Sequence, residues 1–302
     1  MTIRHLKIFI TVSTCGKMRL AAETLYISQP AVSQAIKELE SYYNVSLFER
    51  LSQRLYLTEA GKKLLFHAKY VVDSFDNLDL MMRKQGVSPL LKIGGSVSVG
   101  TYLLNDIIDT MENLFTDLQF KVVVHNTSTI EELVRTSELD IALIEGDISC
   151  EELVQIPIYE DELVIIVGKK HPLFYKERIT LDALKDQVWI SREEGSVTRN
   201  QYEQFLLERH YTIKHKWTCT NTEAIKQAVI RGRGIAIISK MLIENELATG
   251  NLRILPVDDV RITRPIKLVY HKDKYISEYL ETFIHTCRHM NFQNASTLLT
   301  CL

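Results

Sequence analysis

The sequence predicts a small, mainly helical N-terminal domain, a long connecting helix, and a larger α/β domain of two lobes. Its 302 residues are more than one hydrophobic core usually serves. Apolar residues recur at helical spacing over residues 19–43 and 58–84, whereas strand and helix patterns alternate from residue 90 onward. Charge divides the chain too. Residues 1–86 carry 12 Lys and Arg against 8 Asp and Glu, a net +4, and the remainder carries 24 against 30, a net −6.

Residues 19–43 predict two short helices joined by a tight turn. Ser28 stands at the N-cap position of the second helix, and Pro30 lies in its first turn, where a missing N–H costs nothing. Apolar residues then recur at helical spacing and should face a small core: Val32, Ile36 and Leu39. A polar row lies roughly a quarter turn away: Gln29, Ser33 and Lys37. Such a row suits base reading in the major groove, and the alternative is an ordinary amphipathic surface helix.

Residues 47–58 predict two short strands around a three-residue turn, with Arg50 and Arg54 beside the tip. A hairpin that carries two arginines next to a helix-turn-helix is suited to contact the DNA backbone or minor groove. The sequence therefore predicts a winged helix-turn-helix and, as its partner, double-stranded DNA.

Residues 3–65 resemble the winged helix-turn-helix of the LysR-type transcriptional regulators. The resemblance rests on matches in register at Leu6, Phe9, Ala21, Ala22, Glu23, Leu25, residues 28–33, Ile36, Leu39, Glu40, Leu47, Phe48, Arg50, Arg54, Leu57, Thr58, Ala60 and Gly61. Two positions depart from the family, because Arg19 stands where the first helix usually has a Ser or Thr cap and Gln34 replaces a common Arg. The resemblance and the polar row together predict these DNA-contacting residues: Ser28, Gln29, Pro30, Ser33, Gln34, Lys37, Arg50 and Arg54.

The connecting helix is expected to begin after Thr58, a plausible N-cap, and to run to about Lys84. Apolar residues along it alternate spacings of four and three, which is typical of a coiled-coil seam: Leu64, Ala68, Val71, Phe75, Leu78 and Met82. We expect the seam to pair with a second copy of the helix, as the resemblance also implies, and the alternative is packing on the body of the same chain. Residues 85–89 then break the helix.

Repeated strand and helix units after residue 89 predict mostly parallel sheets covered by helices, divided into two sub-domains. Strands are expected at 91–95, 119–125, 139–144, 162–168, 188–191, 214–219, 234–239 and 265–270, and helices near 100–115, 130–136, 198–210, 223–231 and 276–290. The expected domains are a DNA-binding domain (1–58), a dimerisation helix (59–88) and an effector-binding domain (89–302). Lobe I of the last takes about 89–160 and 266–302, and lobe II about 161–265.

Three loops of this body carry hydroxyl groups immediately before a helix, at residues 96–98, 126–129 and 195–198. Free backbone N–H groups, hydroxyl donors and helix dipoles at such loops make an anion site. Simple helix capping is the alternative reading. The side chains and backbone proposed to bind an anionic metabolite are those of Ser96, Ser98, Thr127, Ser128, Gly195, Ser196 and Thr198.

Residues 90–290 resemble the effector-binding domain of the same family, which is built like a periplasmic binding protein. The resemblance rests on Ser96 and on residues 139–143, 145–146, 171–173, 192–199, 221–225 and 234–236. It implies an effector between the lobes, in contact with the first and third loops and often the second. The run 192–199 is similar to that of members that govern sulfur assimilation and carbon fixation, with Val197 in place of the commoner Gly.

The sequence favours a cytoplasmic regulator, with a metabolic enzyme of the same two-lobed fold and an appended DNA module as the alternative. No Gly-x-Ser-x-Gly, His-Glu-x-x-His, Walker A or Gly-x-Gly-x-x-Gly motif supports catalysis. The five cysteines are scattered, which disfavours a zinc site and leaves a redox pair as an open alternative. We expect no cofactor, no metal and no membrane span, a dimer that assembles into a tetramer on an interrupted inverted repeat, and RNA polymerase as a further candidate partner.

Overall fold

The computed structural model describes residues 1–51, 54–83, 88–258 and 260–290, and the chain forms two compact units, Met1–Pro89 and Leu90–Leu302. The predicted helix break at 85–89 lies largely outside the described residues, as does the whole tail at 295–302. No helix among the described residues is both long enough and apolar enough to cross a membrane.

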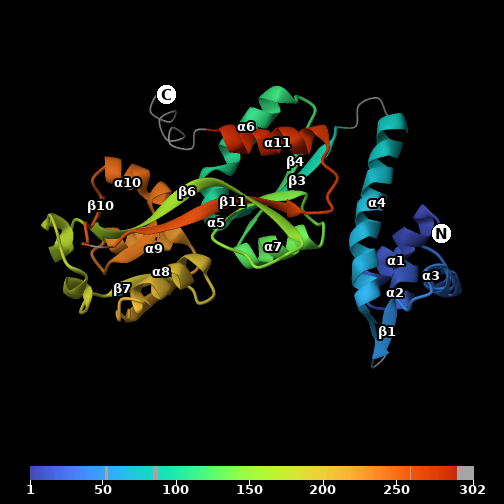
Figure 1. Ribbon diagram of the computed structural model, residues 1–302, viewed down its shortest axis with the longest axis horizontal. Coiled ribbons are helices and arrows are strands. Elements are labelled where there is room, and N and C mark those ends of the chain that lie inside the picture. Colours follow the sequence, from blue (N-terminus) through green and yellow to red (C-terminus); the bar gives the residue numbers. More distant parts are fainter. Residues whose placement is uncertain (52–53, 84–87, 259, 291–302) are drawn as a thin grey trace. The chain divides into compact units, whose positions relative to one another are not determined.

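The first unit is a winged helix-turn-helix (Figure 1). Its elements are α1 (Ile3–Cys15), α2 (Met18–Thr24), α3 (Gln29–Tyr43), β1 (Phe48–Leu51), β2 (Arg54–Leu57) and α4 (Glu59–Arg83). Phe9, Val32 and Leu39 lie fully buried in its core, as the helical spacing predicts. The hairpin register pairs Leu51 with Arg54, so the turn between the strands has two residues and the predicted three-residue turn was wrong.

The long helix α4 packs its first half on its own unit. Thr58 caps it, because the Thr58 hydroxyl accepts a hydrogen bond of 3.0 Å from the Gly61 N–H. Ala68 lies buried in the core that α1 lines, so the apolar stripe does not begin as a free seam. Further along the helix the stripe is open, with Val71, Phe75 and Leu78 exposed by 40%, 43% and 56%. The side chain of Met82 lies outside the described residues.

One mixed sheet runs through both lobes of the second unit. Its strands are β3 (Leu90–Ser96), β4 (Gln119–His125), β5 (Ile141–Glu145), β6 (Leu153–Gly168), β9 (Ala236–Ser239), β10 (Leu252–Ile254) and β11 (Ile262–His271). The order is β10–β6–β11–β5–β3–β4, and β9 also pairs with β6. A second, parallel pair is formed by β7 (Trp189–Arg192) and β8 (His215–Cys219). The two long strands β6 and β11 lie side by side and pass from one lobe to the other (Figure 1).

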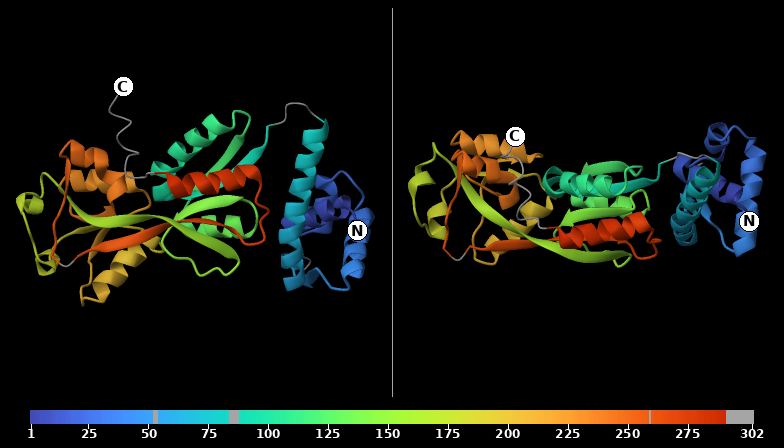
Figure 2. Two further views of the ribbon diagram at one scale, coloured as in Figure 1. Left: turned by 45° about the horizontal axis from the view of Figure 1, so that its top comes forward. Right: turned by 90° about the horizontal axis from the view of Figure 1, so that it is seen from above.

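Helices cover the sheet of lobe I on both faces (Figures 1 and 2). On one face α6 (Leu104–Leu114) and α11 (Glu278–His289) pack on a cluster that contains Ile93 and Leu143. On the other, α7 (Thr127–Arg135) packs on Ala142 and Ile144. Successive residues of the fully buried β5 join these two clusters in turn, because successive side chains of a strand point to opposite faces. The remaining helices are α5 (Val97–Tyr102) in lobe I and α8 (Val197–Leu207), α9 (Thr222–Ile230) and α10 (Glu244–Ala248) in lobe II.

The expected strand and helix order is present, but three expectations about it were wrong. The sheet is mixed rather than mostly parallel, because β11 runs antiparallel to both β5 and β6. The strand expected at 162–168 begins nine residues earlier, at Leu153, since one strand serves both lobes. The helix expected near 100–115 is divided at Leu103 into α5 and α6.

Candidate functional site

The exposed face of α3 carries the row of polar side chains predicted to read DNA. Ser28 is the N-cap, and its hydroxyl accepts a hydrogen bond of 3.4 Å from the Ala31 N–H. The Gln29 amide donates a hydrogen bond of 2.9 Å to the Ser33 hydroxyl, which confirms that these side chains share one face. Pro30 and Lys37 are exposed beside them. Two groups that can each donate or accept hydrogen bonds to base edges therefore lie together on one exposed face.

Gln34 is engaged within the helix. Its amide donates a hydrogen bond of 2.8 Å to Glu38, whose other carboxylate oxygen lies 2.8 Å from His5 Nε2. These hydrogen bonds, the one from Gln34 first, lower the pKa of Glu38. One N–H of the Gln34 amide is thus used by Glu38, and the second remains for another acceptor.

The wing presents two exposed cations. Arg50 on β1 and Arg54 on β2 both lie on the exposed surface of the hairpin. Residues 52–53, between the strands, lie outside the described residues.

The first helix of the helix-turn-helix, α2, begins earlier than predicted. Its N-cap is Lys17, and Arg19 lies inside the helix and pairs with Glu23 at 3.0 Å. The reading of Arg19 as the cap position was therefore wrong.

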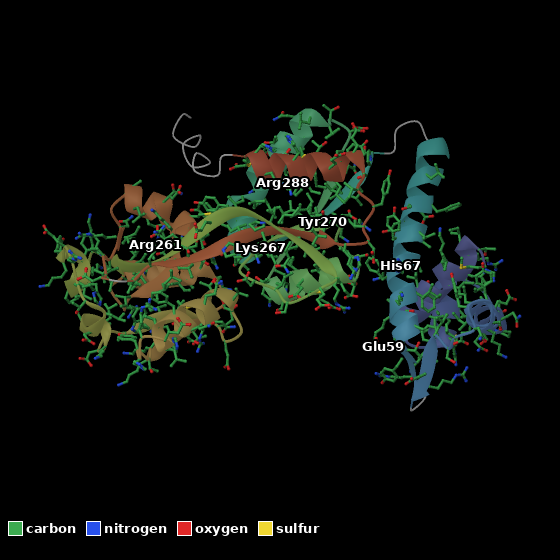
Figure 3. The ribbon with its side chains drawn as sticks, in the orientation of Figure 1. Glu59, His67, Arg261, Lys267, Tyr270 and Arg288 are labelled. Atoms are coloured by element: carbon green, nitrogen blue, oxygen red, sulfur yellow. The ribbon has the colours of Figure 1, made fainter. Side chains whose placement is uncertain are left out.

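Arg264 is a fully buried arginine on β11, the strand that passes between the lobes. Figure 3 labels Arg261, just before this strand, and Lys267 on it. Arg264 Nε donates to Asp161 on β6 at 2.8 Å. Asp161 is buried as well, and its second oxygen accepts from Ser239 at 2.7 Å.

Arg264 also joins two of the three predicted effector loops. Its Nη1 donates a hydrogen bond of 2.8 Å to Thr198 Oγ1 at the start of α8, and its Nη2 lies 3.5 Å from Ser98 Oγ in α5. Ser98 in turn donates to Glu145 at the end of β5 over 3.1 Å. The first and third loops therefore meet around one guanidinium that the sequence analysis did not single out.

A narrow pocket opens beside this arginine. It is lined by Ser98, Arg192, Thr198, Thr222, Ile225, Ile237, Ile238, Ser239 and Leu242, and its free space is close to that of one water molecule. Val197 helps to close the cleft, because its side chain lies against Gly146 of lobe I, where an added Cβ would come within 2.7 Å. The pocket thus combines hydroxyl groups, the Arg192 guanidinium and an apolar wall, the kinds of group that line ligand sites, but as it stands it has room for no more than a water molecule.

Arg192 is held at the edge of this pocket by its chain neighbour. Its Nε and Nη2 both donate to Glu193, at 2.8 Å each. Burial raises the pKa of Glu193, but the hydrogen bonds from Arg192, a backbone hydrogen bond and the charge of Arg192 together lower it, and the net pKa is lowered. Glu193 is therefore the partner of a cation, not a free carboxylate.

The other predicted effector residues are not brought to the pocket by any described contact. Asn126 caps α7, and the exposed Ser128 hydroxyl bonds to the Asn126 side chain over 3.1 Å, as in ordinary capping. Thr127 and Ser196 are buried, and Gly195 is exposed with a φ of +83°. Ser96 is buried, and its hydroxyl has no hydrogen-bond partner among the described residues. The second loop therefore reads as a cap in this state.

A Ser–His–Glu chain in lobe II bears on the enzyme alternative. Ser191 Oγ lies 2.6 Å from His215 Nδ1, and His215 Nε2 lies 2.6 Å from Glu203. Burial, and then the nearby Arg199, lower the pKa of His215. Ser191 is 2% exposed and is absent from the pocket lining, so this geometry gives a substrate no route to the hydroxyl. In the described parts of the chain, no cluster of three or more His, Cys, Asp and Glu is placed to hold a metal.

Family profiles match both units. Residues 3–62 match the profile described as "Bacterial regulatory helix-turn-helix protein, lysR family", and residues 84–291 match the "LysR substrate binding domain". The chain belongs to the LysR family of transcriptional regulators.

Among curated LysR regulators, the chain is 30% identical over 291 residues to the transcriptional regulator CysL of Bacillus subtilis, covering 96% of this chain and 97% of CysL. Its fold is similar to that of ArgP from Mycobacterium tuberculosis, with a TM-score of 0.76, 19% identity, and coverage of 97% of this chain and 96% of ArgP. The second unit is similar to the regulatory domain of Synechocystis CcmR in complex with 2-PG. That match has a TM-score of 0.62 and 24% identity, and covers 67% of this chain and 96% of CcmR's domain.

Proposed function

We propose that this LysR-family regulator reads DNA with α3 and the wing, and that a small anionic effector in the cleft of the second unit controls it. The observation that carries the proposal is Arg264, whose guanidinium bonds Thr198 of one loop and approaches Ser98 of another. A ligand anion that takes these donors would alter a contact that both lobes share. Charge-assisted hydrogen bonds of this kind are the strong ones.

On the DNA side, Gln29 and Ser33 read bases, while Lys37, Arg50 and Arg54 bind phosphates. Two helix-turn-helix units at a fixed spacing read two half-sites, so the operator is an interrupted inverted repeat. The open apolar face of α4, formed by Val71, Phe75 and Leu78, provides the contact between two copies. Dimers then pair into a tetramer through the second units, and the bound assembly contacts RNA polymerase.

On the effector side, CcmR supplies the parallel, because its regulatory domain is described in complex with 2-PG. In this chain the donors are Arg192, Thr198 and Arg264, with Ser98 beside them and bonded to Glu145, and the bond from Arg264 to Thr198 is the contact that an anion would replace. A ligand controls DNA binding only as far as it binds one arrangement of the lobes better than the other.

The DNA half of the proposal is tested by Gln29→Ala and Ser33→Ala, assayed on an operator selected from random DNA by the purified protein. We expect each variant to lose about 1–3 kcal/mol of operator affinity while binding to unrelated DNA is unchanged. Ser41→Ala, at an exposed position of the same helix, is the matched control. An equal loss on unrelated DNA would show that these residues contact the backbone rather than bases.

A further inference from the structure

The charges around Arg264 do not balance. Two carboxylates, those of Asp161 and Glu145, lie against one guanidinium, and all three side chains are buried. Both oxygens of Asp161 are bonded. Only one oxygen of Glu145 is: Oε1 accepts from Ser98, and Oε2 has no hydrogen-bond partner among the described residues. A buried carboxylate oxygen without a donor is costly, so this cluster lacks a donor and a positive charge.

A second acceptor without a donor lies across the cleft. Gly146, next in the chain to Glu145, packs against Gln201 of α8, where an added Cβ would come within 3.0 Å of the side-chain amide. The buried Oε1 of Gln201 also lacks a hydrogen-bond partner among the described residues. Neighbouring segments of the two lobes therefore each carry an unused acceptor, and neither lobe supplies the donor.

Cationic donors remain at the pocket itself. Arg192 lines it, and the bonds given for its guanidinium use Nε and Nη2 and leave Nη1 for another group. Thr198 lines the same pocket, and so does Ser98, which donates to Glu145. The anion-binding side of the pocket thus lies at Arg192 and Thr198, and Ser98 links the pocket to Glu145; Glu145 and Gln201 themselves lie just outside the pocket lining.

We propose that the effector is a small zwitterion, an amino acid or a close relative, whose acid group binds at Arg192 and Thr198 and whose ammonium group donates to Glu145. This inference rests on the proposed effector site and deepens it. An ammonium group brings three N–H donors, which can bond the two unpaired acceptors, and one positive charge, which balances the excess carboxylate. Glu145 is then the residue that selects amines over simple anions.

The experiment is a thermal-shift screen of the full chain against the common L-amino acids and O-acetyl-L-serine. Each compound that raises the melting temperature is then compared, by calorimetric titration, with the same acid lacking its amine. We expect at least one amino acid to bind and its deaminated counterpart to bind at least about tenfold more weakly. A parallel screen uses sulfate, phosphate and phosphorylated acids.

The variants are Glu145→Gln and, should that chain fold poorly, Gln201→Met. We expect either variant to reduce the ratio of the two affinities, that of the amino acid to that of its deaminated counterpart. In Glu145→Gln this ratio should fall to near one. Glu160→Gln neutralises an exposed carboxylate of β6 and should leave the ratio unchanged. Two results would overturn the inference. The first is that no amino acid raises the melting temperature. The second is that an effector without an amine binds the wild type and Glu145→Gln equally. The second result would leave the proposed effector site standing, and operator binding is measured separately.

Discussion

Arg264 decides how the predicted effector loops meet, and nothing in its local sequence marks it. It lies 66 residues from Thr198 and 166 residues from Ser98 along the chain, yet it approaches both side chains. A charged residue in a strand pattern normally suggests a solvent-exposed face. Here the strand crosses between lobes, so the position is enclosed on every side. The hydroxyl loops could be predicted because Ser and Thr before a helix form a local pattern; their shared partner could not.

At the N-cap of α3 we expect Ser28→Ala to destabilise the start of the recognition helix by about 1 kcal/mol, because the Ala31 N–H loses its acceptor. Hydrogen exchange of α3 peptides in the full chain should then quicken about fivefold. Ser41→Ala, in the exposed interior of the same helix, should change exchange little. Unchanged protection in Ser28→Ala would mean that other contacts hold the first turn.

His171 predicts a pH dependence of stability. Burial lowers its pKa from the usual 6.5, and its Nδ1 accepts a hydrogen bond of 3.3 Å from the Leu173 N–H, which requires the neutral ring. The unfolded chain therefore binds the proton at a higher pH than the folded chain does. Stability should fall as the pH drops from about 6.5 toward the lowered folded value.

Urea unfolding followed by tryptophan fluorescence checks this, because both tryptophans, Trp189 and Trp217, lie in the second unit with His171. His171→Asn keeps an acceptor and should lose part of the decline below pH 6.5. His285→Asn, at an exposed position of α11, is the control. An identical pH profile for wild type and His171→Asn would assign the decline to other groups.

At the scale of elements, α4 shows how one amphipathic pattern can serve two contacts. The spacing of Leu64 and Ala68 continues into Val71 and Phe75 without a change of period, so the sequence reads as one seam. In the structure Ala68 belongs to the core of the first unit, whereas Val71 and Phe75 are exposed. The pattern predicted an apolar face correctly; which part of it faces α1 depends on where the helix leaves the small domain.

The exposed part of α4 predicts the oligomeric state. Replacing Phe75 and Leu78 together by Glu should raise the dimer dissociation constant at least tenfold, since each buried side chain of this size contributes about 1.5–3 kcal/mol. Sedimentation equilibrium measures it. Tyr175→Glu, which removes a still more exposed aromatic side chain from lobe II, should leave association unchanged. A double variant that still dimerises like the wild type would place the interface elsewhere.

The full length of the strand β6, which pairs with β11, could not be predicted from local sequence patterns. The buried run of β6 after Glu162 is continuous and predicts a strand, but residues 153–160 are mostly half-buried without alternation, and the sequence did not predict a strand there. This segment becomes a strand only because β11 pairs with it over its length. Pairing with a distant strand decides such a segment, because its own side chains bury too little.

At the scale of the whole molecule, DNA reading and effector binding reside in different units. We expect Thr198→Ala to keep operator affinity and to weaken the response to an effector, because it removes a pocket hydroxyl and the acceptor of Arg264. Gln29→Ala should lower operator affinity and leave the response to the effector unchanged. The response is the shift of operator affinity with effector, measured with a ligand from the thermal-shift screen.

An effector present at 100 times its dissociation constant adds about 2.7 kcal/mol of stability. For a domain of this size that raises the melting temperature by roughly 5–10 °C. Gln29→Ala should keep the whole shift, and Thr198→Ala should keep only part of it. A Thr198→Ala variant with the full shift and the full response would remove that hydroxyl from the site.

By itself the sequence determined the family, the winged helix-turn-helix, the polar face of α3 and the order of strands and helices, because caps, helical spacing and alternation are local and repeat every few residues. Only the tertiary structure decided that one mixed sheet links both lobes, that the second loop stays a cap, and that Ser98 and Thr198 meet at Arg264 beside an unsatisfied Glu145. These depend on contacts between residues far apart in the chain, where burial and pairing override what each segment prefers alone.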